Sequence, residues 1–322
     1  MNATSFFHKI LVPIDFSETA SVALAQAVTM AKRLGAAVTV MHVIPQVEGS
    51  AAFSPGPDAI MAAWQPSEGV AEIEEQLQAT AEQHLREAVE PYRGQGVEIS
   101  CQTLWGTPFI EIIHAVLEEG HDLVMVGTRG RSAISRMLVG STSSKLVRKC
   151  PCPVWVVKPE AKSTLDAILA PIDFSDVGHE SLRLAAALAA QFHAELHVLH
   201  VFAPEHSYYL DFMPEDDLDL ARQRGRHESV ARLQTFVKES ALPVEPALHA
   251  EWGEVVPRTL ATAEQIDAGL IVMGTLGRAG VAGLLIGNTA ENILHTSQRP
   301  LLAVKPLGYV SPVVPRFAAV EV

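Results

Sequence analysis

Two similar stretches, ILVPIDFSE at residues 10–18 and ILAPIDFSD at residues 168–176, decide the fold. Further pairs follow in the same order. They are LWGTP at 104–108 with EWGEV at 251–255, DLVMVGTRGR at 122–131 with GLIVMGTLGR at 269–278, and CPVWVVKP at 152–159 with RPLLAVKP at 299–306. A repeat that runs through the whole sequence is the signature of a structural unit that occurs twice. We therefore expect two copies of one domain.

Length and composition agree with two domains. The chain has 322 residues, of which 48% are hydrophobic and 19% are charged. This is enough for two cores of ordinary size, since domains average about 150 residues, and it is too apolar for disorder. We expect one domain over residues 1–160, a second over 165–307, and a C-terminal tail over 308–322. The tail is apolar enough to dock on the body.

Within the first copy, strand-like and helix-like stretches alternate. Short runs rich in β-branched residues predict buried strands, and apolar residues at helical spacing predict helices, the first of them between Ser17 and a Gly35 cap. The strands are expected at 9–14, 37–44, 97–104, 123–126 and 154–158, and the helices at 18–34, 70–91, 109–117 and 141–149. This order implies parallel strands joined by right-handed crossovers. The fold class is α/β, with two tandem three-layer α/β/α domains, each a five-stranded, mostly parallel, doubly wound sheet.

The segment after the fourth expected strand carries the clearest chemical signal. GTRG at 127–130 is followed nine residues later by GST at 140–142, at the start of a helix. Glycines let the backbone approach a ligand closely, and a helix N-terminus offers N–H groups and a positive dipole end to a phosphate. The alternative for an isolated motif is a tight strand-to-helix turn that a serine caps.

The motif occurs twice, and it resembles the nucleotide motif of the universal stress protein family. That motif is glycine, two residues, glycine, nine residues, then glycine followed by Ser or Thr, and Gly127, Gly130, Gly140 and Ser141 match it without a gap. The strands that end in Pro-Ile-Asp, His-Val-Ile and Val-Lys-Pro are similar to that family too. The whole chain resembles a tandem universal stress protein, and GNTAE at 287–291 is similar to the E-type subgroup.

The resemblance implies the strand order 3-2-1-4-5 in each copy, with a ligand at the carboxyl ends of the strands where the order reverses. It implies that ATP, ADP or AMP binds to the first copy with Mg²⁺ on the phosphate oxygens. Asp15 and Val43 would flank the adenosine, and the glycine turn would hold the phosphates. The implied nucleotide-binding residues are Pro13, Ile14, Asp15, Val43, Gly127, Thr128, Arg129, Gly130, Arg131, Gly140, Ser141 and Thr142. For the two arginines, a solvated surface position is an equal alternative.

The second copy departs from the motif at one position. Asn288 stands where the family has Ser or Thr. Its amide can still donate a hydrogen bond, whereas its larger side chain could fill the phosphate pocket, so nucleotide binding stays open for this copy. The matching positions are Pro171, Ile172, Asp173, Val201, Gly274, Gly277, Gly287, Asn288 and Thr289.

Other candidate sites have simpler explanations. No P-loop, dinucleotide fingerprint or nucleophile elbow is present. Cys150 and Cys152 are one residue apart without a second ligand pair, so we expect them to pack rather than to bind a metal. His42 and His200 end equivalent strands and are expected to bond to backbone rather than to act in catalysis. The acidic run at 215–219 is expected to solvate a helix start, with a metal role as the minor alternative. We predict no metal-binding side chain.

Charge and hydropathy restrict the partners. The net charge of −13 argues against nucleic acid and anionic membranes. The sequence has no apolar run of about 18 residues and no signal peptide, and its three cysteines fit a reducing compartment, so we expect a cytoplasmic protein. The apolar strands at 154–158 and 301–305 would be sheet edges, which normally need covering. They can pair within the chain as a pseudo-dimer, and a homodimer stays open.

A phosphate cradle without a general base, a water-positioning residue or an arginine finger favours binding over turnover. We therefore expect an adenine-nucleotide-binding stress-response protein that acts as a sensor or switch and is not an enzyme. One alternative is an interaction scaffold without nucleotide, in which the long loops at 45–69 and 204–219 face partner proteins. Another is a slow ATPase or autophosphorylating protein. The intact motif favours nucleotide binding for the first copy, and Asn288 favours the scaffold for the second.

Overall fold

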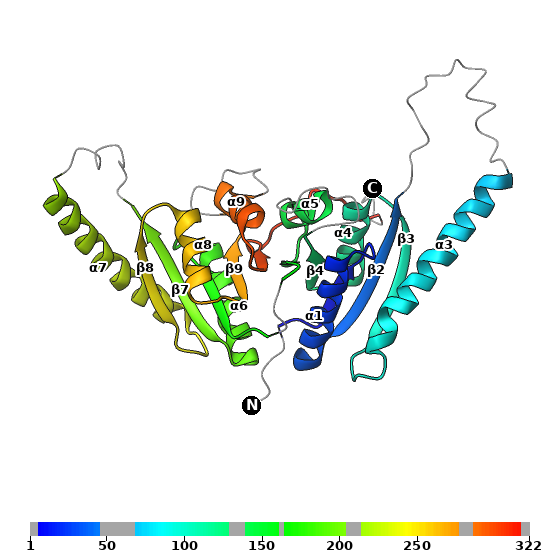
Figure 1. The fold of residues 1–322 in the computed structure, drawn as a ribbon, viewed down its shortest axis with the longest axis horizontal. Helices are drawn as coiled ribbons and strands as arrows, with labels where there is room; N and C mark the ends of the chain where they lie inside the picture. The colour runs from blue at the N-terminus through cyan, green and yellow to red at the C-terminus, as the bar shows by residue number, and fades with distance from the viewer. Residues whose placement is uncertain are drawn as a thin grey trace, which may run out of the picture.

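One ten-stranded sheet runs through the computed structural model, which describes residues 6–45, 68–128, 139–160, 164–203, 214–276 and 286–316 (Figure 1). The strands of the first half are β1 (Lys9–Pro13), β2 (Ala37–Pro45), β3 (Ile99–Gly106), β4 (Leu123–Gly127) and β5 (Val154–Val157). Those of the second half are β6 (Ala167–Pro171), β7 (Glu195–Phe202), β8 (Ala247–Trp252), β9 (Leu270–Gly274) and β10 (Leu301–Val304).

The strand order is β3-β2-β1-β4-β5-β10-β9-β6-β7-β8. Each half therefore has the order 3-2-1-4-5 that the resemblance implied, and every pair inside a half is parallel. The two halves join through β5 and β10, which pair antiparallel with Trp155 opposite Leu302. The two apolar strands expected at sheet edges thus lie at the centre of one continuous sheet, because each covers the edge of the other.

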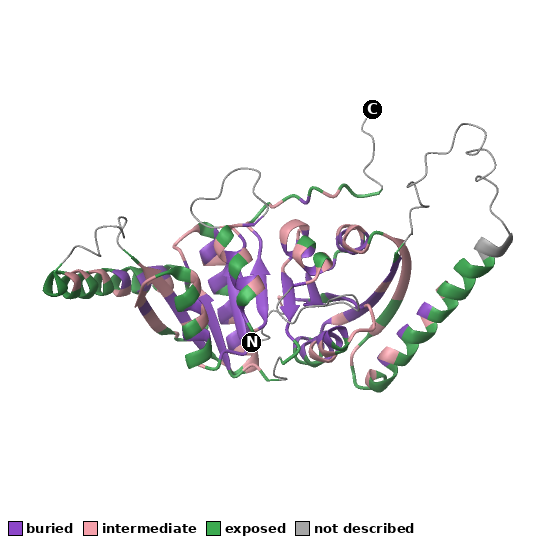
Figure 2. Ribbon diagram, turned by 45° about the horizontal axis from the view of Figure 1, so that its top comes forward, coloured by how far each residue is buried: buried purple, intermediate pink, exposed green. Residues whose placement is uncertain are grey.

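Helices cover both faces of this sheet. One face carries α1 (Glu18–Leu34), α3 (Glu68–Val89), α6 (Asp176–Phe192) and α7 (Glu215–Ser240), which share one apolar core with the strands. The other face carries α4 (Pro108–Glu119), α5 (Ser141–Lys149), α8 (Val255–Gln265) and α9 (Asn288–Thr296) over a second core. Buried residues follow the strands in both halves (Figure 2). The predicted three-layer α/β/α class is confirmed.

Local sequence explains where α1 begins and ends. The Ser17 side chain accepts a hydrogen bond from the Ala20 N–H, and Gly35 ends the helix in the left-handed conformation with φ 69°. These bounds agree with the prediction. The helix expected at 70–91 instead spans Glu68–Val89, because a short 3₁₀ turn, Glu90–Tyr92, takes up the proline. The third strand lies two residues later than expected.

The described part of the C-terminal tail runs back over the first half. The Tyr309 hydroxyl donates to the Arg148 carbonyl at 2.8 Å, and the His114 Nε2–H donates to the Val314 carbonyl at 3.1 Å. Arg316 pairs with Glu111. The tail therefore docks on the body through these polar contacts and through Val313, which packs against the second core, while Val310 is exposed.

Candidate functional site

A cavity of about 550 Å³ opens at the carboxyl ends of β1, β2 and β4 in the first half. This is the point where the strand order reverses, and ligands of open α/β sheets bind at such points. The volume suits a small molecule. The lining residues are Pro13–Phe16, Ala20, Met41–Pro45, Leu77, Thr80, Ala81, His84, Pro108, Ile112, Val126, Gly127 and Gly140–Ser143.

Eight of the twelve residues implied for the first copy line this cavity. They are Pro13, Ile14, Asp15, Val43, Gly127, Gly140, Ser141 and Thr142. Thr128 lies behind the wall, buried, with its N–H bonded to the Val157 carbonyl at 3.0 Å. Arg129, Gly130 and Arg131 lie outside the described residues. The structure thus gathers the described implied residues at one end of the sheet.

The turn after β1 is held by its own side chains. Asp15 Oδ1 accepts hydrogen bonds from the Ser17 N–H at 3.2 Å and from the Ser17 hydroxyl at 2.6 Å. Phe16 takes the left-handed conformation with φ 60°, and its ring lies 4.5 Å from the His42 ring. The His42 Nδ1–H donates to the Ile14 carbonyl at 2.8 Å, as expected for a partly buried histidine bonded to backbone. This network fixes the rim of the cavity.

The start of α5 is tied to the end of β4. The Ser143 hydroxyl donates to the Gly127 carbonyl at 2.7 Å, and the Gly140 N–H donates to the Thr128 carbonyl at 2.5 Å. A Cβ on Gly127 would lie 2.9 Å from Thr19, so this close approach needs glycine. Gly140 caps α5 without a side-chain hydrogen bond. Among the described residues, the first amides of α5 thus receive no side-chain cap from their cap residue at the cavity, which is the arrangement that receives an anion.

Helix α3 supplies lining residues that the sequence motifs do not reveal. Leu77, Thr80, Ala81 and His84 face the cavity from this helix. Their only signal is the apolar helical spacing through Leu77 and Ala81, which by itself predicts core packing. Their role depends on how α3 lies across the ends of the strands, and no local pattern encodes that.

The second half repeats the rim. Asp173 Oδ1 accepts from the Ser175 hydroxyl at 2.5 Å, and Phe174 has φ 60°. The His200 Nδ1–H donates to the Ile172 carbonyl at 3.1 Å, the same bond that His42 makes. Pro171, Asp173 and their neighbours thus hold the same turn as their counterparts in the first half.

Larger side chains occupy the space beside the second rim. Phe202 stands where the first half has Ile44, and its ring packs so closely on Gly225 that an added Cβ there would lie 2.7 Å from it. The Arg232 guanidinium lies 4.1 Å from the centre of the Phe174 ring. A Cβ on Gly274 would overlap the side chain of Val177. The two halves share a backbone design but differ in how side chains fill its pocket.

The glycine motif of the second half ends at α9. Gly287 caps this helix without a side-chain hydrogen bond, and its N–H donates to the Thr275 carbonyl at 2.7 Å. Asn288 is exposed at the start of α9, as Ser141 is at the start of α5, so whether its side chain takes up phosphate space stays a prediction. Gly277 lies outside the described residues.

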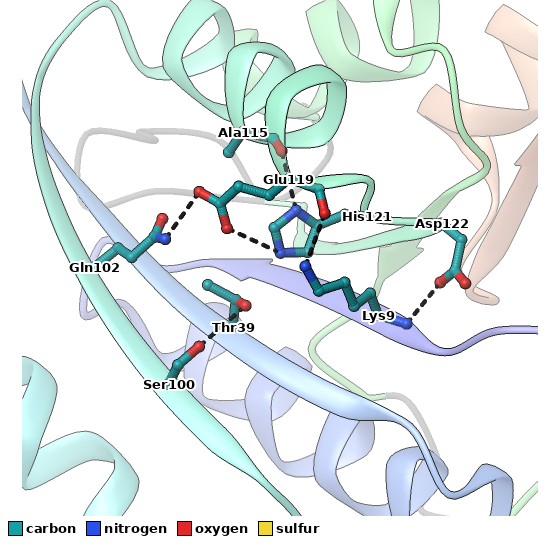
Figure 3. Close-up of polar contacts among 8 residues, drawn as sticks. All are labelled: Lys9, Thr39, Ser100, Gln102, Ala115, Glu119, His121 and Asp122. Carbon is teal, nitrogen blue, oxygen red and sulfur yellow. Dashed lines mark hydrogen bonds and ion pairs between the residues drawn. The ribbon is translucent and has the colours of Figure 1, made fainter.

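Polar residues at the opposite end of the first half have a structural role (Figure 3). Asp122 accepts from the backbone N–H of Lys9 at 3.0 Å. The buried His121 donates from Nδ1–H to the Ala115 carbonyl at 3.1 Å, and Glu119 Oε2 lies 3.9 Å from its Nε2. Burial lowers the pKa of His121. These contacts fix the amino ends of β1 and β4, away from the cavity.

Two of the three cysteines pack inside the second core, whereas Cys101 is exposed. Cys150 and Cys152 are buried with their sulfur atoms 3.6 Å apart, as the packing prediction expected. Over the described ranges, no three His, Cys, Asp or Glu side chains gather as a metal site. In the same part of the chain, no helix has the length and apolar character needed to cross a membrane.

Comparisons with known proteins place the chain among relatives of the same architecture. The model of the universal stress protein family matches residues 6–158 and again residues 164–305. Universal stress protein E of Escherichia coli (strain K12) is 29% identical over 96% of this chain and 97% of its own length. A universal stress protein of Mycobacterium bovis is 26% identical over 92% and 97%.

Solved structures agree. A functionally unknown protein from Pseudomonas aeruginosa matches with a TM-score of 0.63 at 25% identity, over 95% of both chains. A universal stress protein from Archaeoglobus fulgidus matches with a TM-score of 0.63 at 23% identity, over 92% of this chain and 98% of its own. Because the family model matches both halves, the chain belongs to the universal stress protein family, as a tandem member.

Proposed function

We propose that the first half binds an adenine nucleotide in the cavity at the ends of β1, β2 and β4. Through this binding the chain would act as a sensor or switch in a stress response. The observation that carries the proposal is the start of α5, which lacks a side-chain cap where it borders a cavity large enough for a nucleotide. A helix start of this kind is a ready site for phosphate.

The lining divides into two chemical parts. Apolar side chains such as Ile14, Leu77 and Ile112 offer a wall for a flat base. Gly140, Ser141 and Thr142 offer N–H and hydroxyl donors for phosphates. This separation fits a ligand with an apolar end and an anionic end.

Mg²⁺ would arrive with the nucleotide, where it neutralises phosphate charge. Asp15 is the one carboxylate among the described lining residues, and its Oδ1 already accepts two hydrogen bonds that hold the turn. The described lining therefore supports an ion held mainly by phosphate oxygens and water rather than by a protein cage. Arg129 and Arg131 remain candidates for additional charge.

Members of this family are generally not enzymes. The titratable side chains among the described lining residues are Asp15, His42 and His84. The first two hold the rim through hydrogen bonds, and this favours binding without turnover. Slow ATP hydrolysis is tested by the release of phosphate from Mg-ATP, and autophosphorylation by transfer of the labelled γ-phosphoryl group to the protein.

For the second half, we propose a supporting role, because Phe202, Val177 and Arg232 fill space beside its rim. This half keeps the fold of a binding domain, with a larger ring at Phe202 where the first half has Ile44. Stoichiometry separates this role from a second binding site.

The direct test combines nucleotide content with a blocking variant. Purified protein is denatured, the released ATP, ADP and AMP are counted per chain, and Mg-ATP binding is measured by calorimetry. Thr80→Trp places a large ring at the cavity from an exposed helix position and should abolish binding. Gln83→Trp, exposed on the same helix and outside the lining, is the matched control. Absence of both bound nucleotide and Mg-ATP binding would overturn the proposal and favour the interaction scaffold.

A further inference from the structure

Two buried lysines cross between the halves of the molecule. Lys305 directly follows β10, and Lys158 directly follows β5; each is only 6% exposed. Lys305 Nζ donates to the Val147 carbonyl at 2.6 Å and to the Arg148 carbonyl at 2.8 Å, both near the end of α5. Lys158 Nζ donates to the Leu294 carbonyl of α9 at 3.0 Å. Each lysine therefore binds the helix of the other half.

The chemistry of a helix end explains these contacts. The last carbonyls of a helix lack partners within the helix and carry the negative end of its dipole, so a lysine there is favourable. Tyr309 adds a second donor to the Arg148 carbonyl, at 2.8 Å. Arg148 itself pairs with Glu291 of α9. Burial lowers the pKa of Lys305 to about 8, a cost that these carbonyls and the nearby Cys150 and Cys152 offset only in part.

The other end of α5 is the proposed phosphate site. The helix has only nine residues, and its start is tied to β4 through the bond from Ser143 to Gly127. One end thus lies at the cavity of the first half, and the other is held by residues of the second half. A shift at the held end moves the amides at the cavity, because the helix is short and hydrogen-bonded throughout.

We propose that Lys305 is a positioning residue for phosphate recognition in the first half, so that the nucleotide site is complete only in the presence of the second repeat. This rests on the proposed function. It gives the second half a task that does not require a ligand of its own. The antiparallel pairing of β5 with β10 makes the contact possible, because it brings each lysine beside the partner helix.

The test compares ATP with adenosine. In Lys305→Met, ATP affinity at the first site should fall by at least about fivefold. Adenosine affinity should stay within about twofold, because α5 contacts only the phosphates. Lys305→Arg should restore ATP binding. Lys158→Met is the matched control, since this lysine is equally buried but holds α9 and should leave the first site unchanged.

Tyr309→Phe removes a single donor from a half-buried position and keeps the test valid if Lys305→Met does not fold. It should weaken ATP binding in the same direction. Unchanged ATP affinity in these variants, or equal losses for ATP and adenosine, would overturn the inference and leave the proposed function standing. A wild-type chain that binds neither ligand would overturn both.

Discussion

Two glycines of the repeated motif, Gly127 and Gly287, differ in whether their surroundings leave room for a side chain. A Cβ on Gly127 would meet the backbone carbon and the hydroxyl of Thr19 at 2.9 Å, closer than real side chains approach. A Cβ on Gly287 would meet only the Thr275 carbonyl at 3.5 Å, an ordinary contact. Gly127 is thus needed for the approach of β4 to α1, whereas Gly287 is not needed for space.

Gly127→Ala should therefore reduce the free energy of unfolding by about 1–3 kcal/mol, the usual cost of forcing an extra methyl group into packed surroundings. Because β4 and α1 border the cavity, it should also weaken Mg-ATP binding. Gly287→Ala is the control and should cost less, about 0.5–1 kcal/mol, because it only replaces a glycine N-cap by alanine. Denaturant unfolding measures both, and equal effects would contradict the steric argument.

His121 makes stability depend on pH. Burial lowers its pKa in the folded chain, and burial together with His197 lowers the pKa of His249. Below the ordinary value of 6.5, the unfolded chain takes up protons that the folded chain does not, so the free energy of unfolding falls as the pH falls. Each histidine contributes a slope of at most about 1.4 kcal/mol per pH unit.

His121→Gln should flatten this dependence while His249 keeps the remainder. The measurement is denaturant unfolding at several values between pH 7 and pH 5. The charged neighbours Lys9, Glu119 and Asp122 are present in both proteins, so the difference between the two slopes reports the histidine (Figure 3). Identical slopes for the wild type and His121→Gln would contradict the assignment.

Helix α3 shows how far the helical spacing of apolar residues predicts which side chains of a helix are buried. The sequence places Ile73, Leu77, Ala81, Leu85 and Val89 on one apolar face. The structure buries the last three, but leaves Ile73 58% and Leu77 47% exposed, because the first part of α3 extends beyond the sheet (Figure 1). Periodicity identifies the face of a helix, whereas the length of the neighbouring strands decides how much of that face is covered.

Matched truncations along α3 test this difference. Leu85→Ala should reduce the free energy of unfolding by about 2–5 kcal/mol, since it removes a fully packed side chain and leaves a cavity. Ile73→Ala should change it by less than about 0.5 kcal/mol, because that side chain is largely in water. Denaturant titration gives both values. A large effect at Ile73 would mean that another surface covers it.

Sequence predicts the fold of this chain better than its pocket. The repeat and the alternation of strands and helices determine the three layers, and glycine spacing locates the turn that borders the cavity. The contributions of Thr80 and His84 are not predictable, because they come from a helix distant in sequence. The contact of Phe202 on β7 with Gly225 on α7 is likewise not predictable, because the two residues are distant in sequence and the ring leaves no room for a Cβ on the helix.

For the whole molecule, the antiparallel pair of β5 and β10 turns two domains into one sheet. Buried contacts such as those of Lys305 and Lys158 cross this junction in both directions. The two halves therefore form one continuous structure, but they differ at the place where the first half has its cavity. The first half has an open cavity at the ends of its strands, and the second half has larger side chains, such as Phe202 in place of Ile44, beside the matching turn.

This asymmetry predicts the stoichiometry of binding. We expect one Mg-ATP per wild-type chain, because Phe202 places a larger ring at the position where Ile44 lines the first cavity. Ile44→Phe should abolish binding, because Ile44 lines the first cavity and a larger ring at this position takes up cavity space. Phe202→Ile with Asn288→Ser restores first-half residues in the second half and should raise the value toward two. Calorimetry gives each stoichiometry. Two nucleotides per wild-type chain, or an unchanged single site in Ile44→Phe, would contradict the view that side-chain filling alone separates the two halves.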